Sequence, residues 1–120
     1  MLITHMLEVN KMVHKYGNFS KHQIKETKQK LRKQIFFLLI YVDPETNEEY
    51  KDVNVDDAFV HLLYKLGGLN SILFFPPELV TVISLLEAAR IEYSKENFDF
   101  KIYRKLVLDS GAEILKIKEV

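Results

Sequence analysis

The segment Gln34–Val42 (QIFFLLIYV) places the strongest constraint on the fold, because its eight residues from Ile35 onward are all apolar. Such a run indicates either a strand covered on both faces or the buried end of a helix. Most of its side chains are β-branched or aromatic, which favours a strand. The residues Asp43–Asn47 then supply turn chemistry, and Glu49–Val55 can return as a more polar strand. We therefore expect a hairpin at this point.

The residues before this segment predict two helices. Leu2–Tyr16 has apolar side chains at three- and four-residue spacing, and Gly17 follows where a helix C-cap prefers glycine. Ser20 can cap a second helix over Lys21–Lys33, with Gln23 as the other half of a capping box.

Two further helices are expected in the middle of the chain. Asp56 or Asp57 can cap a short helix that reaches Leu66 and ends at Gly67-Gly68. Pro76-Pro77 then precedes a strongly apolar helix over Leu79–Tyr93, because proline suits the first turn of a helix.

The stretch 97–108 is ambiguous, since its apolar residues alternate and also recur four residues apart. The turn sequence at Asp109-Ser110-Gly111 favours strands on both sides, with 114–118 as the second. We therefore predict one compact α+β domain over residues 1–120, with four helices covering a small antiparallel sheet of two hairpins. The alternative is an all-α five-helix bundle, which follows if 34–42 and 97–108 are both helical.

The sequence Leu106–Ile114 (LVLDSGAEI) resembles the active-site signature of retroviral-type aspartic proteases, in which an Asp-Ser/Thr-Gly-Ala turn follows hydrophobic residues. The resemblance covers about nine residues and would imply Asp109 as the catalytic carboxylate. The helical patterns before the motif contradict the all-β fold of that family. We therefore interpret the motif as a tight turn, with Asp109 bonding backbone N–H groups and Gly111 supplying a positive φ.

Two acidic patterns are candidate metal sites. The alternate polar residues from Asp43 to Glu49 are similar to the start of an EF-hand loop, but Glu48 stands where the loop needs glycine. Asp57 and His61 are one helical turn apart, and we interpret them as an exposed ion pair. The sequence thus predicts no catalytic, cofactor-binding or metal-ligating residues, no cofactor and no enzyme activity.

The absence of cysteine excludes disulfides and zinc–thiolate sites and is compatible with a reducing compartment. The N-terminal residues lack the basic start of a signal peptide. Ile35–Val42 is far shorter than the roughly 20 residues that span a bilayer. We therefore expect a cytoplasmic protein with no membrane contact.

The formal net charge of zero conceals two oppositely charged segments. Lys21–Lys33 has six basic residues against one acidic residue, a net charge of +5. Asp43–Asp57 has seven acidic residues against one basic residue, a net charge of −6. The basic helix is a candidate docking face for an acidic protein surface or for phosphates. Its candidate partner-binding residues are Lys21, Lys25, Lys28, Arg32 and Lys33.

Phe74 and Phe75, just before the two prolines, are the other candidates for partner binding. We interpret them first as core residues beneath the helix that follows. If a phenylalanine is exposed instead, the rigid turn presents it as an interface anchor.

The sequence predicts a small non-enzymatic protein-interaction module: an adaptor, inhibitor or assembly component that binds another protein through charged faces. The alternative is a nucleic-acid-binding or regulatory protein that uses Lys25, Lys28 and Arg32 on phosphates. A third interpretation is a homo-oligomer, in which the basic face of one copy meets the acidic face of another.

Overall fold

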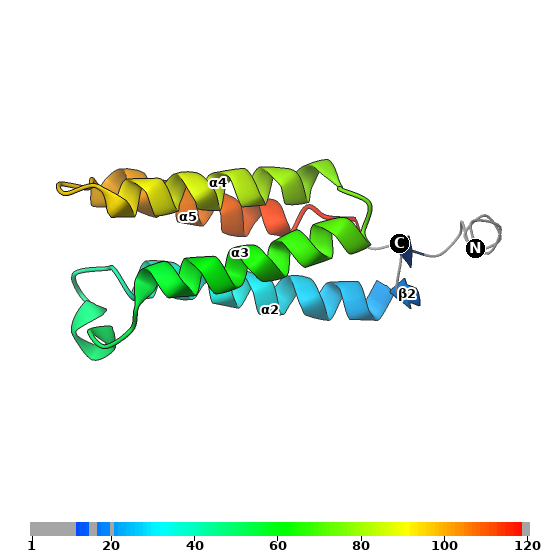
Figure 1. Ribbon diagram of the computed structural model, residues 1–120. Helices are drawn as coiled ribbons and strands as arrows, with labels where there is room; N and C mark the ends of the chain where they lie inside the picture. The colour runs from blue at the N-terminus through cyan, green and yellow to red at the C-terminus, as the bar shows by residue number, and fades with distance from the viewer. Residues whose placement is uncertain (1–11, 15–16, 20, 119–120) are drawn as a thin grey trace.

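The computed structural model describes residues 12–14, 17–19 and 21–118 of the chain. Four helices lie side by side and antiparallel to their chain neighbours in an elongated up-down-up-down bundle (Figure 1). They are α2 (Lys21–Ile40), α3 (Val55–Ile72), α4 (Pro77–Ser94) and α5 (Phe100–Ile114), with a short 3-10 helix η1 (Asn47–Tyr50) between α2 and α3.

The predicted α+β fold is wrong, because residues 21–118 contain helices, turns and loops but no strand. The two predicted hairpins do not form: 34–40 ends α2, and 100–114 is α5. A pair of three-residue antiparallel strands, β1 (Met12–His14) and β2 (Gly17–Phe19), precedes the bundle and belongs to neither hairpin. The all-α class of the alternative is therefore correct for the bundle.

The predicted first helix over 2–16 falls mostly outside the described residues. Residues 1–11 and 15–16 are not described, and Met12–His14 is extended. Gly17 lies in β2 instead of at a helix end, and the predicted cap Ser20 is also outside the described residues.

The segment 34–40 is helical because residues outside α2 donate hydrogen bonds to the carbonyl groups at its C-terminal end. The last four carbonyl groups of a helix have no partner within it and must find one elsewhere when they are buried. In α2 all four do so. Phe37 O accepts from Tyr41 N (2.9 Å), Leu38 O from the Tyr103 hydroxyl (2.6 Å), Leu39 O from Asp43 N (2.9 Å) and Ile40 O from Thr46 Oγ1 (2.6 Å).

The side chains of the continuous apolar run point in three directions around this helix. Its inward side chains are buried in the core: Ile35, Leu38, Leu39 and Val42. Phe37 and Tyr41 instead pack against Tyr50 of η1, with ring centroids 6.4 and 5.3 Å from the Tyr50 ring. Phe36 remains 50% exposed. A strand covered on both faces is thus not needed to explain the sequence.

The starts of α3 and α4 follow local capping chemistry. Asn54, and neither Asp56 nor Asp57, caps α3 by accepting from Asp57 N at 3.0 Å. Pro77 occupies the first turn of α4 as predicted. A two-hydrogen-bond ion pair between Arg90 and Asp56 (2.7 and 3.0 Å) joins the two helices and lowers the pKa of the Asp56 carboxyl.

Helix α3 does not end at Gly67-Gly68 but runs through both glycines to Ile72. Both residues are exposed, and a β-carbon on either would meet no atom within 4 Å. The glycines therefore weaken the helix without ending it, and burial of Leu66 and Leu69 on either side holds its geometry.

The four-residue spacing, and not the alternation, determines the structure of 97–108. Asp99 caps α5 by accepting from Lys101 N at 2.8 Å. The buried face of α5 consists of Tyr103, Val107, Ser110 and Ile114. The protease-like motif is part of this helix, and Ser110 Oγ donates to Val107 O at 2.7 Å. The predicted tight turn at Asp109–Gly111 is therefore wrong, and the motif lacks the turn that the protease chemistry needs.

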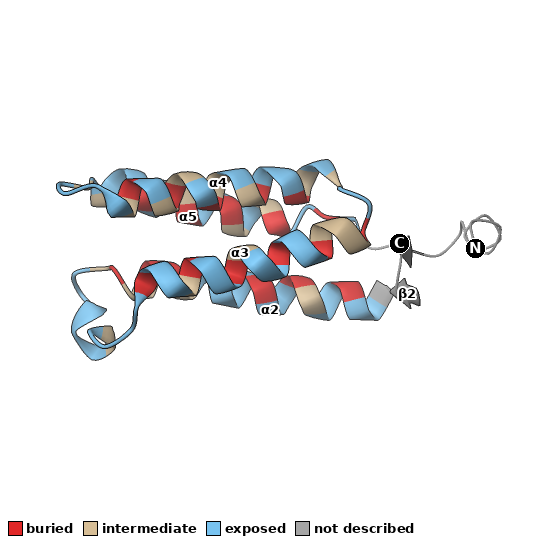
Figure 2. Ribbon diagram, viewed as in Figure 1, coloured by how far each residue is buried: buried red, intermediate tan, exposed pale blue. Residues whose placement is uncertain are grey.

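The core follows the inward faces of all four helices, where the buried residues are concentrated (Figure 2). Tyr103 is fully buried near its aromatic centre, with the Phe59 and Phe98 rings edge-on at 6.1 and 6.0 Å. Burial, with Tyr93 as a smaller cause, raises the pKa of the Tyr103 hydroxyl, which keeps its proton for Leu38 O.

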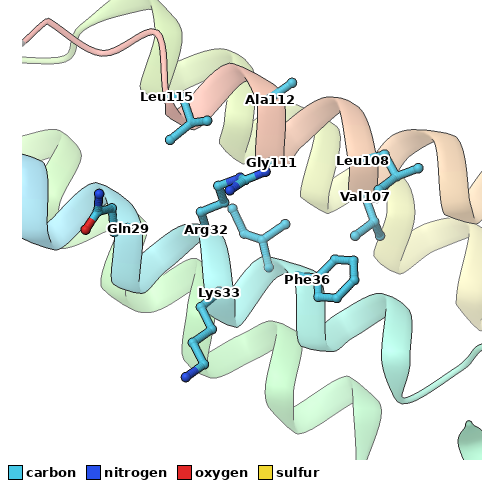
Figure 3. A pocket seen from close by; sticks show the side chains of 10 residues that line it. Gln29, Arg32, Lys33, Phe36, Val107, Leu108, Gly111, Ala112 and Leu115 are labelled. Atoms are coloured by element: carbon cyan, nitrogen blue, oxygen red, sulfur yellow. The ribbon is translucent and has the colours of Figure 1, made fainter.

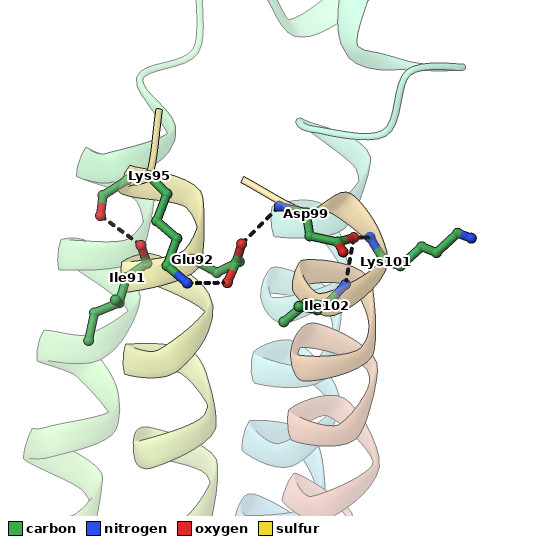
Figure 4. A network of polar contacts seen from close by, with 7 residues as sticks. Ile91, Glu92, Lys95, Asp99, Lys101 and Ile102 are labelled. Carbon is green, nitrogen blue, oxygen red and sulfur yellow. Dashed lines mark hydrogen bonds and ion pairs between the residues drawn. The ribbon is translucent and has the colours of Figure 1, made fainter. Parts of the chain in front are cut away.

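A buried carboxylate organises the turn between α4 and α5 (Figure 4). Glu92 Oε2 accepts from Asp99 N at 2.8 Å, and Glu92 Oε1 pairs with Lys95 Nζ at 2.9 Å. The hydrogen bond from the Asp99 N–H, followed by the one from Lys95, lowers the pKa of Glu92. The same turn then places Asp99 at the start of α5.

We predict that Tyr103→Phe lowers the free energy of unfolding by about 1–3 kcal/mol, because it leaves a buried carbonyl at the end of α2 without a donor. Urea unfolding followed by circular dichroism measures the difference. The matched control is Tyr64→Phe, which removes the same hydroxyl from a side chain that is 84% exposed. Equal stabilities for the two variants would contradict the capping role of Tyr103.

We predict that Glu92 contributes stability above its ordinary pKa of about 4.5 and that this contribution is lost as the pH falls through its lowered folded-state pKa. Glu92→Gln should therefore be less stable than the parent at pH 7, and the difference should shrink in acid. Thermal unfolding between pH 7 and pH 3 measures it. Glu96→Gln, which removes an exposed acid from the same turn, is the matched control for the loss of one carboxylate.

Candidate interaction groove

A groove of about 840 Å³ runs between α2 and α5 (Figure 3). It is lined on α2 from Gln29 to Phe36, and on the other side from Val107 in α5 to Leu115, the residue that follows α5. Phe36 is seven positions after Gln29, and at a rise of 1.5 Å per residue this corresponds to about 10 Å, or two helical turns. The groove is therefore short, straight and parallel to both helices.

The floor and one wall of the groove are apolar. Phe36, Leu108 and Leu115 are 50%, 38% and 43% exposed, although each has a large hydrophobic side chain. Buried Ile35 and Val107 lie beneath them. Apolar surface that is grouped in a hollow marks binding sites more often than apolar residues scattered singly do.

The charged side chains that line this groove are both basic. Arg32 and Lys33 come from α2. Figure 3 shows Arg32 extending towards α5, whereas the end of the Lys33 side chain extends away from α5, so Lys33 contributes its charge at the outer edge of the groove. Lys25 lies seven residues before Arg32, and Arg104 lies four residues before Leu108, so both belong to the same flanks of their helices. Both are exposed. The groove and its surroundings thus combine an apolar floor with a positive potential.

The acidic side chains of α5 lie on another row of the helix. Asp109 pairs with Lys105 at 2.8 Å, and Glu113 pairs with Lys116 at 3.1 Å. These four residues follow one another at three- and four-residue spacing and do not line the groove. Their charges therefore compensate one another locally and leave the charge of Arg32 and Lys33 uncompensated by α5.

The predicted basic residues separate into three groups. Lys25, Arg32 and Lys33 are exposed on α2, and the last two line the groove. Lys28 is only 6% exposed, and its Nζ donates to Ile117 O at 2.5 Å, so it fastens the C-terminal segment to α2. Lys21 begins α2, but its side chain is outside the described part of the structure.

Phe74 and Phe75 form the turn between α3 and α4, outside the groove. The preferred interpretation as core residues is wrong, because they are 53% and 63% exposed. Both have positive φ (62° and 60°), which is unusual for bulky residues. Phe75 N donates to Asn70 O at 2.8 Å and Phe74 N to Ser71 O, the pattern of a helix-ending Schellman motif with phenylalanine in the usual place of glycine.

The two charged segments lie towards opposite ends of the bundle. Helix α2 begins at the end where α3 joins α4, whereas the acidic segment 43–57 connects α2 to α3 at the other end (Figure 1). The charges are therefore separated along the long axis of the molecule. The groove overlaps the C-terminal part of the basic segment, at residues 29–33, and continues towards the acidic end as far as Phe36.

The described residues contain no group of three or more His, Asp or Glu side chains that could hold a metal ion. Asp57 and His61 are both exposed, as predicted, but the described residues show no ion pair between them, so that part of the prediction is wrong. Among the helices described, none is long and apolar enough to cross a membrane.

The apolar residues of the groove, Phe36, Leu108 and Leu115, were missed by the sequence reasoning. They become visible only when 34–42 and 97–108 are given a helical period. Phe36 then falls four residues after Arg32, and Leu115 falls seven residues after Leu108 on the same flank.

Comparison of the chain with protein-family models, curated proteins and solved structures found no match.

Gly111 forms part of the groove, although the packing of α5 does not require a glycine there. Its backbone is helical, and a β-carbon at this position would lie 3.8 Å from Ile35 Cγ2, an ordinary contact. A glycine inside a helix is less stable than alanine by roughly 0.5–1 kcal/mol. Because glycine lacks a β-carbon, the groove is deeper at Gly111 than it would be with any larger residue there.

We predict that Gly111→Ala raises the free energy of unfolding by about 0.5–1 kcal/mol, because it restores helix propensity without a clash. Gly67→Ala in α3, where the added β-carbon meets no atom within 4 Å, should give a gain of similar size. Urea unfolding measures both variants. A loss of stability for Gly111→Ala alone would show that the glycine serves internal packing.

Proposed function

We propose that this chain is a small non-enzymatic protein-interaction module, an adaptor, inhibitor or assembly component, whose α2–α5 groove receives another protein. The observation that carries the proposal is the grouping of Phe36, Leu108 and Leu115 beside Arg32 and Lys33. Interfaces combine exposed apolar anchors with a charged rim that steers the partner, and this groove has both.

The polarity of the groove supports a protein partner with a negative surface. Burial of the exposed apolar area favours binding by about 25 cal/mol for each Å² removed from water. The basic side chains add steering that weakens with salt. A partner that offers apolar side chains between acidic ones satisfies both parts of the groove.

Nucleic-acid binding is the second candidate, favoured by the exposed row of Lys25, Arg32 and Lys33 on α2. The burial of Lys28 removes one of the three predicted phosphate contacts. The groove offers one aromatic ring, Phe36, for base stacking, whereas single-strand binders generally use several. The protein partner is therefore the better-supported proposal.

We also propose that the protein acts in the cytoplasm, which the absence of cysteine supports. The absence of a membrane-spanning helix among the described residues agrees with this part of the proposal.

We predict that a photo-crosslinking amino acid at position 36 of the full chain gives a discrete crosslinked protein in cells that produce it. The same amino acid at position 102, an exposed isoleucine on the other flank of α5, should not give that product. Combining position 36 with Arg32→Glu and Lys33→Glu should abolish the product, because charge reversal repels an acidic partner.

The same chain is titrated with mixed-sequence duplex and single-stranded DNA at low and moderate salt. Undetectable binding before and after charge reversal fits the protein-interaction proposal. Tight, salt-sensitive DNA binding that Lys25→Gln, Arg32→Gln and Lys33→Gln together abolish would favour the second candidate. Absence of a groove-dependent crosslink would contradict the first.

A further inference from the structure

We infer that the occupant of the α2–α5 groove is an amphipathic helix with acidic flanks, supplied by a partner protein. This inference rests on the proposed function and specifies the partner of that site. Three properties of the groove lead to this inference: its dimensions, the small residues that line it on α5 and the sign of its charges.

The dimensions match the apolar stripe of one helix. The groove follows two turns of α2 and, on the other side, the last turns of α5 from Leu108 to the C-cap residue Leu115. A helix lying in it places side chains at i, i+3 or i+4, and i+7 along one face, which also extends over two turns. Three apolar anchors of such a helix would therefore meet the apolar part of the groove.

Gly111 and Ala112 allow the close approach that helix packing needs. Helices pack with axes 8–10 Å apart, and small residues at the contact allow the shorter distances. Gly111 is half-buried and Ala112 is exposed, and both line the groove. Neither the backbone nor the core packing of α5 requires glycine at 111. We therefore interpret the absence of a side chain there as room for an occupant of the groove.

The basic residues of the groove determine which charged residues the bound helix should have beside its apolar stripe. Arg32 and Lys33 line the groove, Lys25 and Arg104 extend the same helix flanks, and no acidic residue lines it. A helix with glutamate or aspartate beside its apolar stripe would place carboxylates near these cations. A helix with basic flanks would meet repulsion, which provides specificity as well as affinity.

The acidic segment of a second copy is a weaker fit. Residues 43–54 supply negative charge, but their regular structure is a single 3-10 helix of four residues, η1. Among these residues, Val53 has the exposed large hydrophobic side chain, with an exposed fraction of 36%. One valine cannot cover the exposed surface of Phe36, Leu108 and Leu115.

The test uses the full chain and a fluorescein-labelled synthetic peptide of about 14 residues, or some four helical turns. The peptide has leucine at i, i+4 and i+7 and glutamate on both flanks. A second peptide has lysine in place of every glutamate, and a third has the composition of the first without a single apolar face. Fluorescence anisotropy at low and moderate salt gives the dissociation constants.

We expect the glutamate peptide to bind at least about tenfold more tightly than either control peptide, by a margin that falls with salt. Gly111→Leu, which fills the groove, should weaken its binding by about tenfold or more. Gly67→Leu is the matched control, because it adds the same side chain to an exposed position of α3 and should leave binding unchanged.

Equal binding of the glutamate and lysine peptides, equal effects of Gly111→Leu and Gly67→Leu, or no peptide binding would each overturn the inference. If the crosslink at position 36 forms but the glutamate peptide fails to bind, the partner is a protein of another shape and the proposed function stands. If light scattering shows that the chain forms a dimer which Gly111→Leu dissociates, the occupant is a second copy and the inference falls.

Discussion

The hydrogen bond from the Tyr103 hydroxyl to Leu38 O is the interaction on which the rest of the bundle depends. It joins α5 to the end of α2 across the core and satisfies a carbonyl that would otherwise be buried without a donor. Together with the bond from Thr46 to Ile40 O, it allows α2 to continue as a helix to Ile40. The most apolar stretch of the chain thus becomes a helix end fixed by tertiary contacts.

The groove follows from that continuity. In a helix, Phe36 lies one turn after Arg32 and on the same flank, so the aromatic ring and the guanidinium both face α5. In a strand, residues four apart would also share a face, but they would lie about 13 Å apart along it. The helical rise brings the apolar and basic groups into one two-turn site. The acidic residues Asp109 and Glu113 pair on a different row of α5, so the site keeps its positive charge.

The sequence alone was enough to predict the elements whose ends depend on local chemistry. The start of α4 at Pro77 and the helix over Leu79–Tyr93 were predicted because proline and the apolar spacing act within the element itself. The start of α2 at Lys21 was predicted as well, but its continuation past Lys33 was not, because it depends on the hydrogen bond from Tyr103, 65 residues away in the chain, to Leu38 O. Helix α5 was missed because its apolar residues both alternate and recur four residues apart, and the sequence at 109–111 favoured a turn. Of the predicted site, Arg32 and Lys33 line the groove, whereas Lys28 is turned inward by its bond to the C-terminal segment. Lys28 lies four residues after buried Ile24 and three before buried Leu31, so the helical period already places it on the inward row. Its acceptor, Ile117 O, is 89 residues away and could not be predicted from local sequence.

The most direct test of this account is the backbone chemical shifts of residues 34–40 and 100–108 in solution, measured by NMR on the full chain. Because both segments are helical, we expect Cα shifts displaced to the helical side throughout, with slow hydrogen exchange for the amides of Leu38 and Leu39 near the capped end of α2. Cα shifts on the strand side over either segment would contradict it, because a strand there would separate the residues that form the groove.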